Sequence, residues 1–310
     1  MSLVGRVRSC EIKIVILAKK SKDYYKKNQP IYPGNGQPLN FIIMAKVSSN
    51  VPPNHPMSSS LGGYSTYKRR DSNKTIIRSK GGPSADRIKN DPSFARVRSQ
   101  NDEFAGCSSA AKMLKDTLSS IKHLSDFNVH ARLTSLVSSI RELDTNRVGT
   151  RSIIFSRGRH LLDGFSLRDA NTFDNVIATP VTFTIDRSTQ TAVVQLPPLT
   201  PGKNFNPAWN YPYFRFRINL GLIRDMVYVE KIGYQTSLQS PPGYTEMLDT
   251  EWYPSVGKLI GQELGLHLVG QALDESCHLV LSIGIEFGTP SGTGIKPVKH
   301  AGAGKVLGIA

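Results

Sequence analysis

The chain is poor in cysteine, because Cys10, Cys107 and Cys277 are the only three among its 310 residues. They lie far apart in the sequence, and no two have the C-x-x-C spacing that is typical of a zinc site. An odd number of thiols also leaves at least one without a partner, which does not favour a disulfide framework. We therefore expect a protein of a reducing compartment and predict a cytoplasmic location.

Long apolar runs are missing as well. The run at residues 14–18 is short, and Lys19 and Lys20 follow it directly, whereas a secretory signal has a longer apolar core and a small-residue cleavage site. No stretch approaches the ~20 apolar residues that a membrane-spanning helix needs. The sequence therefore predicts no membrane span.

The common short catalytic motifs are also lacking: there is no H-E-x-x-H, no G-x-S-x-G and no Asp-rich metal loop. The histidines and thiols that could act in catalysis are scattered along the chain: His123, His130, His160, His267, His278, Cys107 and Cys277. Acid–base catalysis requires such groups to be close together. We therefore predict that the chain is not an enzyme and that it holds no metal and no cofactor.

Acidic residues are scarce in the N-terminal part. Residues 1–84 contain 15 Lys plus Arg, against only Glu11, Asp23 and Asp71. Residues 85–310 carry 24 basic and 21 acidic groups, so most of the formal charge of +15 belongs to the N-terminal part. Clustered Lys and Arg attract the phosphates of nucleic acids. A nucleic-acid partner is therefore an alternative that concerns mainly this part of the chain.

Residues 1–63 are predicted to form a disordered basic arm and a linker. Residues 1–43 are basic and interrupted by proline and glycine, so they cannot bury enough apolar surface to offset the entropy of ordering. Met44 opens the segment MAKVSSN, which is typical of a natural start. The chain then either carries a genuine basic tail or begins upstream of its true start. Residues 51–63 (VPPNHPMSSSLGG) are typical of a flexible or extended connector.

Residues 64–83 are predicted to form a short extended hairpin, with a turn at residues 71–73. An isolated hairpin is marginally stable, so we expect it to join a partner sheet in the same chain or in a neighbouring copy. The basic segment 64–80 is also the part that a nucleic-acid-binding protein would use. The candidate interaction residues are Tyr67, Lys68, Arg69, Arg70 and Arg78.

Residues 84–150 are predicted to be helical. Ser84 is a fair helix cap, and Pro92 ends the first turn and can begin a longer helix. Apolar residues then recur at helical spacing in two runs: Met113, Leu114, Thr117, Leu118 and Ile121, and Val129, Leu133, Leu136, Val137 and Ile140. We expect a helical hairpin joined across residues 126–128, whose second helix ends at Gly149.

The charged residues of this segment, among them Arg96, Arg98 and Glu103, are open to two interpretations, and the turn at residues 81–84 offers a third for the segment. They can form a solvated helix face of mixed charge, or a clamp between subunits or domains. The turn at residues 81–84 before a helix is typical of anion binding, but it lacks the Lys-Ser ending of a P-loop.

Residues 151–310 are predicted to be rich in strands, in an antiparallel β-sandwich or a jelly-roll-like arrangement that begins at about Ile153. The expected strands are 181–185, 191–196, 226–235, 267–269 and 277–287. The run 279–285 alternates apolar residues on one face and has Val280 on the other, so we expect its strand to lie centrally. Phe214 and Phe216 alternate with Arg215 and Arg217, which predicts one apolar face and one basic face.

Two long segments, 197–213 and 240–254, are predicted to be loops that carry several aromatic residues, among them Trp209 and Trp252. Their rings either pack on the ends of the sandwich or bind a protein or a carbohydrate, because loops often carry function. Arg215 and Arg217 could equally stack on nucleic-acid bases.

Part of the chain resembles a family of uncharacterised proteins that is common in Bacteroidetes genomes. The residues that carry the resemblance are Gly81, Gly82, Pro83, Ser84, Arg87, Ile88, Asp91, Pro92, Phe94, Arg96, Arg98, Asn101, Glu103, Phe104 and the segment 112–114, with a Gly-Phe segment at 162–165 and a closing strand at 282–287. The resemblance extends from about Lys74 to the C-terminus and is strongest up to Phe165. The family has no assigned activity, so the resemblance implies a chain architecture and no mechanism.

We therefore expect an α+β protein with a basic N-terminal arm, a helical hairpin and a β-rich C-terminal half. The expected function is non-enzymatic: a structural protein that assembles with itself, or with another protein. A nucleic-acid-binding protein and a carbohydrate-binding module are the two alternatives.

Overall fold

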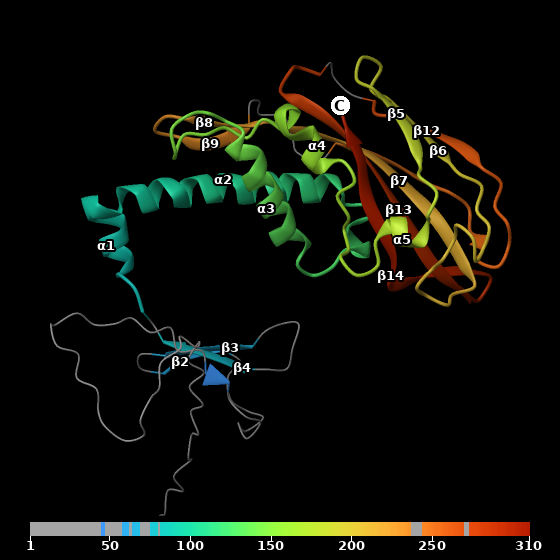
Figure 1. Ribbon diagram of the computed structural model, residues 1–310, viewed down its shortest axis with the longest axis horizontal. Helices are drawn as coiled ribbons and strands as arrows, with labels where there is room; N and C mark the ends of the chain where they lie inside the picture. Colours follow the sequence, from blue (N-terminus) through green and yellow to red (C-terminus); the bar gives the residue numbers. More distant parts are fainter. Residues whose placement is uncertain are drawn as a thin grey trace, which may run out of the picture. The chain divides into compact units, whose positions relative to one another are not determined.

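The computed structural model describes residues 45–46, 58–61, 64–68, 75–79, 81–236, 244–269 and 273–310. The chain divides into two compact units, Met1–Ile88 and Lys89–Ala310. Helices and antiparallel sheets are both present (Figure 1), which confirms the predicted α+β class.

The first unit contains a four-stranded antiparallel sheet in the order β1-β4-β3-β2. Its strands are β1 (Ala45–Lys46), β2 (Ser58–Leu61), β3 (Tyr64–Lys68) and β4 (Thr75–Ser79). The hairpin was predicted for residues 64–83. Its two strands are observed as β3 and β4, in which Thr66 pairs with Ile77.

The prediction that residues 1–63 are only an arm and a linker is wrong for the two short strands that lie in this range. β2 pairs along its whole length with β3. The rest of the predicted arm lies outside the described residues.

The helices follow the first sheet in the chain. They are α1 (Ala85–Asn90), the 3-10 turn η1 (Pro92–Phe94), α2 (Ala95–Thr117), the 3-10 turn η2 (Lys122–Leu124) and α3 (Val129–Glu142). Asp91 caps η1, because its side chain accepts a hydrogen bond of 2.9 Å from the backbone N–H of Ser93. The predicted helical hairpin is confirmed as α2 and α3, but α3 ends at Glu142, well before Gly149.

The remaining elements are mostly strands. They are η3 (Phe155–Gly158), α4 (Arg159–Leu162), α5 (Phe173–Val176), β5 (Thr182–Asp186), β6 (Thr191–Leu196), β7 (Tyr213–Arg224), β8 (Met226–Val229), β9 (Gly233–Thr236), β10 (Thr245–Asp249), β11 (Tyr253–Pro254), β12 (Gln262–His267), β13 (Cys277–Ser291) and β14 (Gly294–Ile309). The main sheet has the order β10-β7-β13-β14, and β11 also pairs with β7. A smaller sheet has the order β12-β6-β5, and β8 and β9 form a separate hairpin. The predicted β5–β6 hairpin and the central position of β13 are confirmed.

Several predictions for this half are wrong in detail. The predicted strand 226–235 is two antiparallel strands, β8 and β9, with a turn between them. The predicted strand 267–269 overlaps only the last residue of β12. The first strand begins at Thr182 and not near Ile153, because short helical turns occupy the residues between them. β10 and β11 lie in the segment 240–254, which was predicted to be a loop. β14 was missed because glycine, alanine and lysine interrupt its apolar pattern; a side chain at Gly302, for example, would lie 2.3 Å from the backbone oxygen of Ile285.

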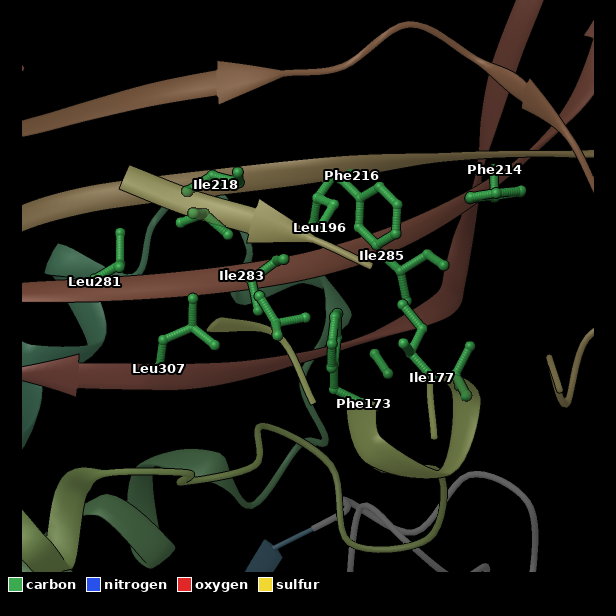
Figure 2. Close-up of a cluster of buried hydrophobic side chains, with 14 of the residues drawn as sticks. Phe173, Ile177, Leu196, Phe214, Phe216, Ile218, Leu281, Ile283, Ile285 and Leu307 are labelled. Carbon is green, nitrogen blue, oxygen red and sulfur yellow. The ribbon is translucent and has the colours of Figure 1, made fainter. Parts of the chain in front are cut away.

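The main sheet is buried on both faces. On one face, alternate residues of β7 and β13 pack with side chains of the smaller sheet and of α5 in one core. Figure 2 shows Phe216, Ile285 and Leu196, which come from three different strands of this core. On the other face, Ile223, Val280 and the side chains of α2 and α3 form a second core. The helices α2 and α3 and the smaller sheet therefore lie on opposite sides of the main sheet (Figure 1).

The helical layer approaches β13 closely because that strand has a glycine at the point of contact. A Cβ atom at Gly284 would lie 2.7 Å from Cδ1 of Leu124 and 2.9 Å from Cγ2 of Ile121. Both contacts are shorter than any that real Cβ atoms make, so a larger residue must displace the helical layer.

We expect Gly284→Val to lower the free energy of unfolding by about 1–3 kcal/mol, because it overpacks this contact. Denaturation in urea measures the change. Gly265→Val is the matched control, since Gly265 also lies in a strand and a Cβ atom there would meet nothing within 4 Å. An equal loss of stability in both variants would contradict the proposed contact.

Candidate functional site

The two arginines predicted on the basic face of β7 lie in an ion-pair network beneath the helices. Arg215 Nε donates a 2.9 Å hydrogen bond to Oε2 of Glu286 on the neighbouring strand β13. Nη1 of Arg215 and Nη2 of Arg217 lie 3.0 and 2.7 Å from Oδ2 of Asp249 on β10. His123 of η2 completes the network, since its Nε2 lies 2.7 Å from Oε1 of Glu286.

Glu286 is the carboxylate at the centre of this network, and only 3% of the residue is exposed. Burial by itself raises the pKa of Glu286, but hydrogen bonds from His123 and Arg215 and the charge of Arg217 lower it more. The pKa therefore lies below its ordinary value of 4.5. Glu286 is ionised at neutral pH and holds three elements together.

Arg215 and Arg217 are thus engaged inside the chain, which leaves little of either side chain for a partner. Only 17% of each side chain is exposed. The guanidinium of Arg215 also stacks on Trp252, with its carbon 4.7 Å from the ring centroid, and Arg217 Nη1 donates to the backbone oxygen of Ser120. This geometry favours a structural role over base stacking.

A second network surrounds Glu103 of α2, which is 1% exposed. Both of its carboxylate oxygens accept hydrogen bonds from Arg151, at 2.8 and 2.6 Å, and Oε1 also accepts one of 2.7 Å from the backbone N–H of Gly149. Nη1 of Arg141 lies 3.3 Å from Oε2. Burial raises the pKa of Glu103, but these partners lower it further, to below its ordinary value of 4.5. The interpretation of Glu103 as part of a solvated face is therefore wrong, because the side chain ties α2 to α3 and to the loop that follows α3.

The other charged candidates on the helices lie nearer the surface. Arg96 is exposed. Arg98 is half-buried, and its Nη1 donates a 2.9 Å hydrogen bond to the backbone oxygen of Asp91. Neither residue belongs to the Glu103 network that the structure describes. The prediction of an ion-pair clamp that includes these two arginines stays a prediction.

The two tryptophans of the predicted aromatic loops pack against other side chains of the second unit, to which they belong. Trp209 lies against the core, with its ring centroid 5.5 Å from that of Phe287, and Arg168 covers its ring at a similar distance. Trp252 is half-buried beside Arg215, and its ring would touch a Cβ atom at Gly288. These contacts favour packed rings over a carbohydrate platform.

Only part of the basic hairpin in the first unit is described. Arg78 Nε donates a 3.2 Å hydrogen bond to Oγ of Ser65, and its guanidinium lies 5.8 Å from the ring centroid of Tyr67. Lys68 is the last residue of β3. Arg69 and Arg70 lie outside the described residues.

The histidines that were considered for catalysis do not form a reactive set in the part of the chain that the structure describes. Nε2 of His278 lies 2.9 Å from Oδ1 of Asp225, but His278 is only 1% exposed, so no substrate can reach it. Ser108 Oγ and Nε2 of His130 are 3.4 Å apart, and no carboxylate contacts Nδ1 of this histidine among the described residues. Burial raises the pKa of the Cys107 and Cys277 thiols, which makes them poor nucleophiles.

Within the described ranges, no three His, Cys, Asp or Glu side chains are grouped so that they could hold a metal ion. No described helix is long and apolar enough to cross a membrane. One feature that the sequence did not reveal is a hollow next to His123, lined by Lys115 and Lys122. These residues are distant in the chain from Arg168 and His300 on its other side, so no local pattern could indicate the site.

Comparison of the chain with protein-family models, with curated proteins and with solved structures gave no match. The resemblance to a Bacteroidetes family therefore stays a prediction. The function must be argued from the geometry of the chain itself.

We expect Glu286→Gln to destabilise the protein by about 1–3 kcal/mol, because it removes the buried carboxylate that accepts from Arg215 and His123, while Asp249 still pairs with both arginines. Chemical denaturation at neutral pH measures this change. Glu246→Gln on the exposed side of β10 is the control and should leave the midpoint unchanged. A midpoint for Glu286→Gln equal to that of the control would contradict the structural role of the network.

The lowered pKa values of the buried carboxylates Glu103 and Glu286 make the stability of the fold depend on pH. Glu103 and Glu286 have lower pKa values in the folded chain than their ordinary 4.5, so they stabilise the fold above that pH and lose this contribution as the pH falls through their folded pKa values. Unfolding free energies measured from neutral pH to about pH 4 and below should fall in the wild type. The decline should be smaller in the double variant Glu103→Gln/Glu286→Gln, and equal slopes would refute this origin.

Proposed function

We propose that this chain is a non-enzymatic structural protein that associates with itself through the sheet of its first unit. The second unit, which we interpret as a β-sandwich covered by a helical layer, is then the body that the sheet links into a larger assembly.

The observation that carries the proposal is that this sheet has no described core. Among its side chains for which burial is described, Tyr67 and Arg78 are exposed, and the others are half-buried: Ser65, Thr66, Ile76 and Ile77. A sheet gains stability by burying one apolar face against a second layer. Association of copies of the chain would supply that layer.

Ile76 and Ile77 are adjacent in β4, so their side chains lie on opposite faces of the sheet. Each face therefore offers one isoleucine as a candidate contact. Ile76 pairs with Tyr67 across the strands and lies on the same face as Arg78, while Ile77 pairs with Thr66. One of these faces is proposed to be the interface. In-chain pairing by β2 and β1 already occupies the outer sides of β3 and β4, so packing of a sheet face is favoured over strand addition at this hairpin.

The alternatives have less support. The contacts of the arginines argue against nucleic-acid binding. The guanidinium of Arg78 contacts Ser65 and Tyr67 of its own sheet, and Arg215 and Arg217 are paired with carboxylates. Carbohydrate binding is disfavoured because Trp209 and Trp252 both pack against other side chains of the second unit.

Light scattering coupled to size exclusion tests the proposal on the full chain, at low and at high salt. We expect a discrete oligomer without nucleic acid, as judged by absorbance at two wavelengths. Deletion of residues 44–80 should give a monomer whose circular dichroism retains the helices and strands of the second unit, whereas deletion of residues 1–43 should leave the oligomer intact.

Point variants locate the interface. Ile76→Lys and Ile77→Lys place a charge on opposite faces of the sheet, and we expect one of them to weaken self-association about tenfold or more while the other has little effect. A monomeric full chain, or an oligomer that survives the 44–80 deletion, would overturn the proposal. A monomer that releases bound nucleic acid in salt would favour the nucleic-acid alternative instead.

A further inference from the structure

A hollow of about 460 Å³ lies on the second unit, beside the C-terminal end of α2. Its lining comes from α2, from η2 and the residues after it, and from two residues far along the chain, Arg168 and His300. The volume lies in the range of sites for small molecules, ~300–1,000 Å³. The lining residues are Lys115, Lys122, His123, Ser125, Asp126, Phe127, Val129, Arg168 and His300.

The lining is rich in positive charge, although residues 85–310 as a whole are nearly balanced. Lys115 and Lys122 are the cations without a carboxylate partner: neither ammonium group makes an ion pair with any residue that the structure describes. His300 adds an exposed imidazole at the same hollow. Two unpaired ammonium groups at one concave site favour a ligand with more than one negative charge.

The remaining charges at the hollow are balanced within the chain. Asp126 is the only acid in the lining; its Oδ2 accepts a hydrogen bond from the backbone N–H of Asp169, and its Oδ1 lies 3.9 Å from Nε of Arg168. His123 is held by Glu286 at 2.7 Å, and Glu286 in turn is paired with Arg215. The local excess therefore comes from the two lysines.

An aromatic ring lies beside these cations. Phe127 is 69% exposed, among the largest exposed fractions of the apolar side chains in the described residues. It follows Asp126 directly and lines the same hollow as Val129. An exposed phenyl ring next to a cationic site is suited to stack on a planar ring of a ligand.

From these features we propose that the hollow binds a small phosphorylated molecule that carries a planar ring, with a nucleoside monophosphate as the simplest example. Lys115 and Lys122 contact the phosphate oxygens, and Phe127 stacks on the ring. A concave site with two free cations and one ring matches a single nucleotide better than a long strand, which requires an extended track of cations. The proposal is independent of the proposed self-association, since it rests only on the second unit.

Isothermal titration calorimetry of the full chain with adenosine monophosphate tests the site, with inorganic phosphate and adenosine as separate probes. We expect saturable binding of the nucleotide that is tighter than that of either probe. Lys115→Gln and Lys122→Gln should each weaken nucleotide binding about tenfold, as expected for the loss of a charge-assisted hydrogen bond. Phe127→Ser should lower the affinity for the nucleotide toward that for inorganic phosphate and leave phosphate binding unchanged.

Lys258→Gln is the matched control, because this exposed lysine lies outside the hollow. It should bind the nucleotide like the wild type. The proposal fails if the nucleotide shows no saturable binding, if the control weakens binding as much as the two lysine variants, or if adenosine or phosphate alone binds as tightly as the nucleotide. A single-stranded oligonucleotide that binds many times more tightly, and loses this affinity in the same variants, would instead identify a nucleic-acid surface and overturn the small-molecule proposal.

Discussion

The ion pairs of Glu286 are the constraint on which the second unit depends. A carboxylate on the helix-facing side of a central strand is costly unless it is paired and hydrogen-bonded. Here its partners come from β7 and η2, and through the arginines it is linked to β10. The register of three strands and the docking of the helical layer must therefore all be correct before this charge is satisfied. Such a network defines one arrangement of the elements more strictly than apolar packing alone would.

The sequence alone does not show which basic residues of the chain are free to bind a partner. Arg215, Arg217, Arg141 and Arg151 are mostly covered in the fold, and each is paired with a carboxylate that lies far away in the chain. Lys115 of α2 and Lys122 of η2 are different, since both line one hollow and have no such partner among the described residues. What distinguishes the two groups is the position of the acids, which only the fold reveals.

Elements with a clear period could be predicted from the sequence. The helical stripe of α3, the alternation of β7 and the apolar run of β13 were all recognised, because burial on one face imposes a repeat on the residues. β14 lacked such a repeat because glycines interrupt it; Gly302 and Gly304, for example, lie against the backbone of β13 and the side chains of Leu124 and Ile121. The partners of Glu103 and the lining of the hollow could not be predicted for a related reason. Both sites consist of residues that are far apart in the sequence and are brought together only by the fold, such as Lys115, Arg168 and His300 at the hollow.

The separation of contacting segments along the chain has a consequence for biosynthesis. Ile121 and Leu124 pack on β13, and His123 pairs with a residue 163 positions later. At a synthesis rate of ~5–20 residues per second, the helical hairpin leaves the ribosome on the order of 10–30 s before the strand that covers it. During that interval its apolar face has no sheet to cover it, and contacts at this sequence distance also form slowly once both parts exist. The nascent helices are thus the part of the chain that most needs protection from aggregation while the protein is being made.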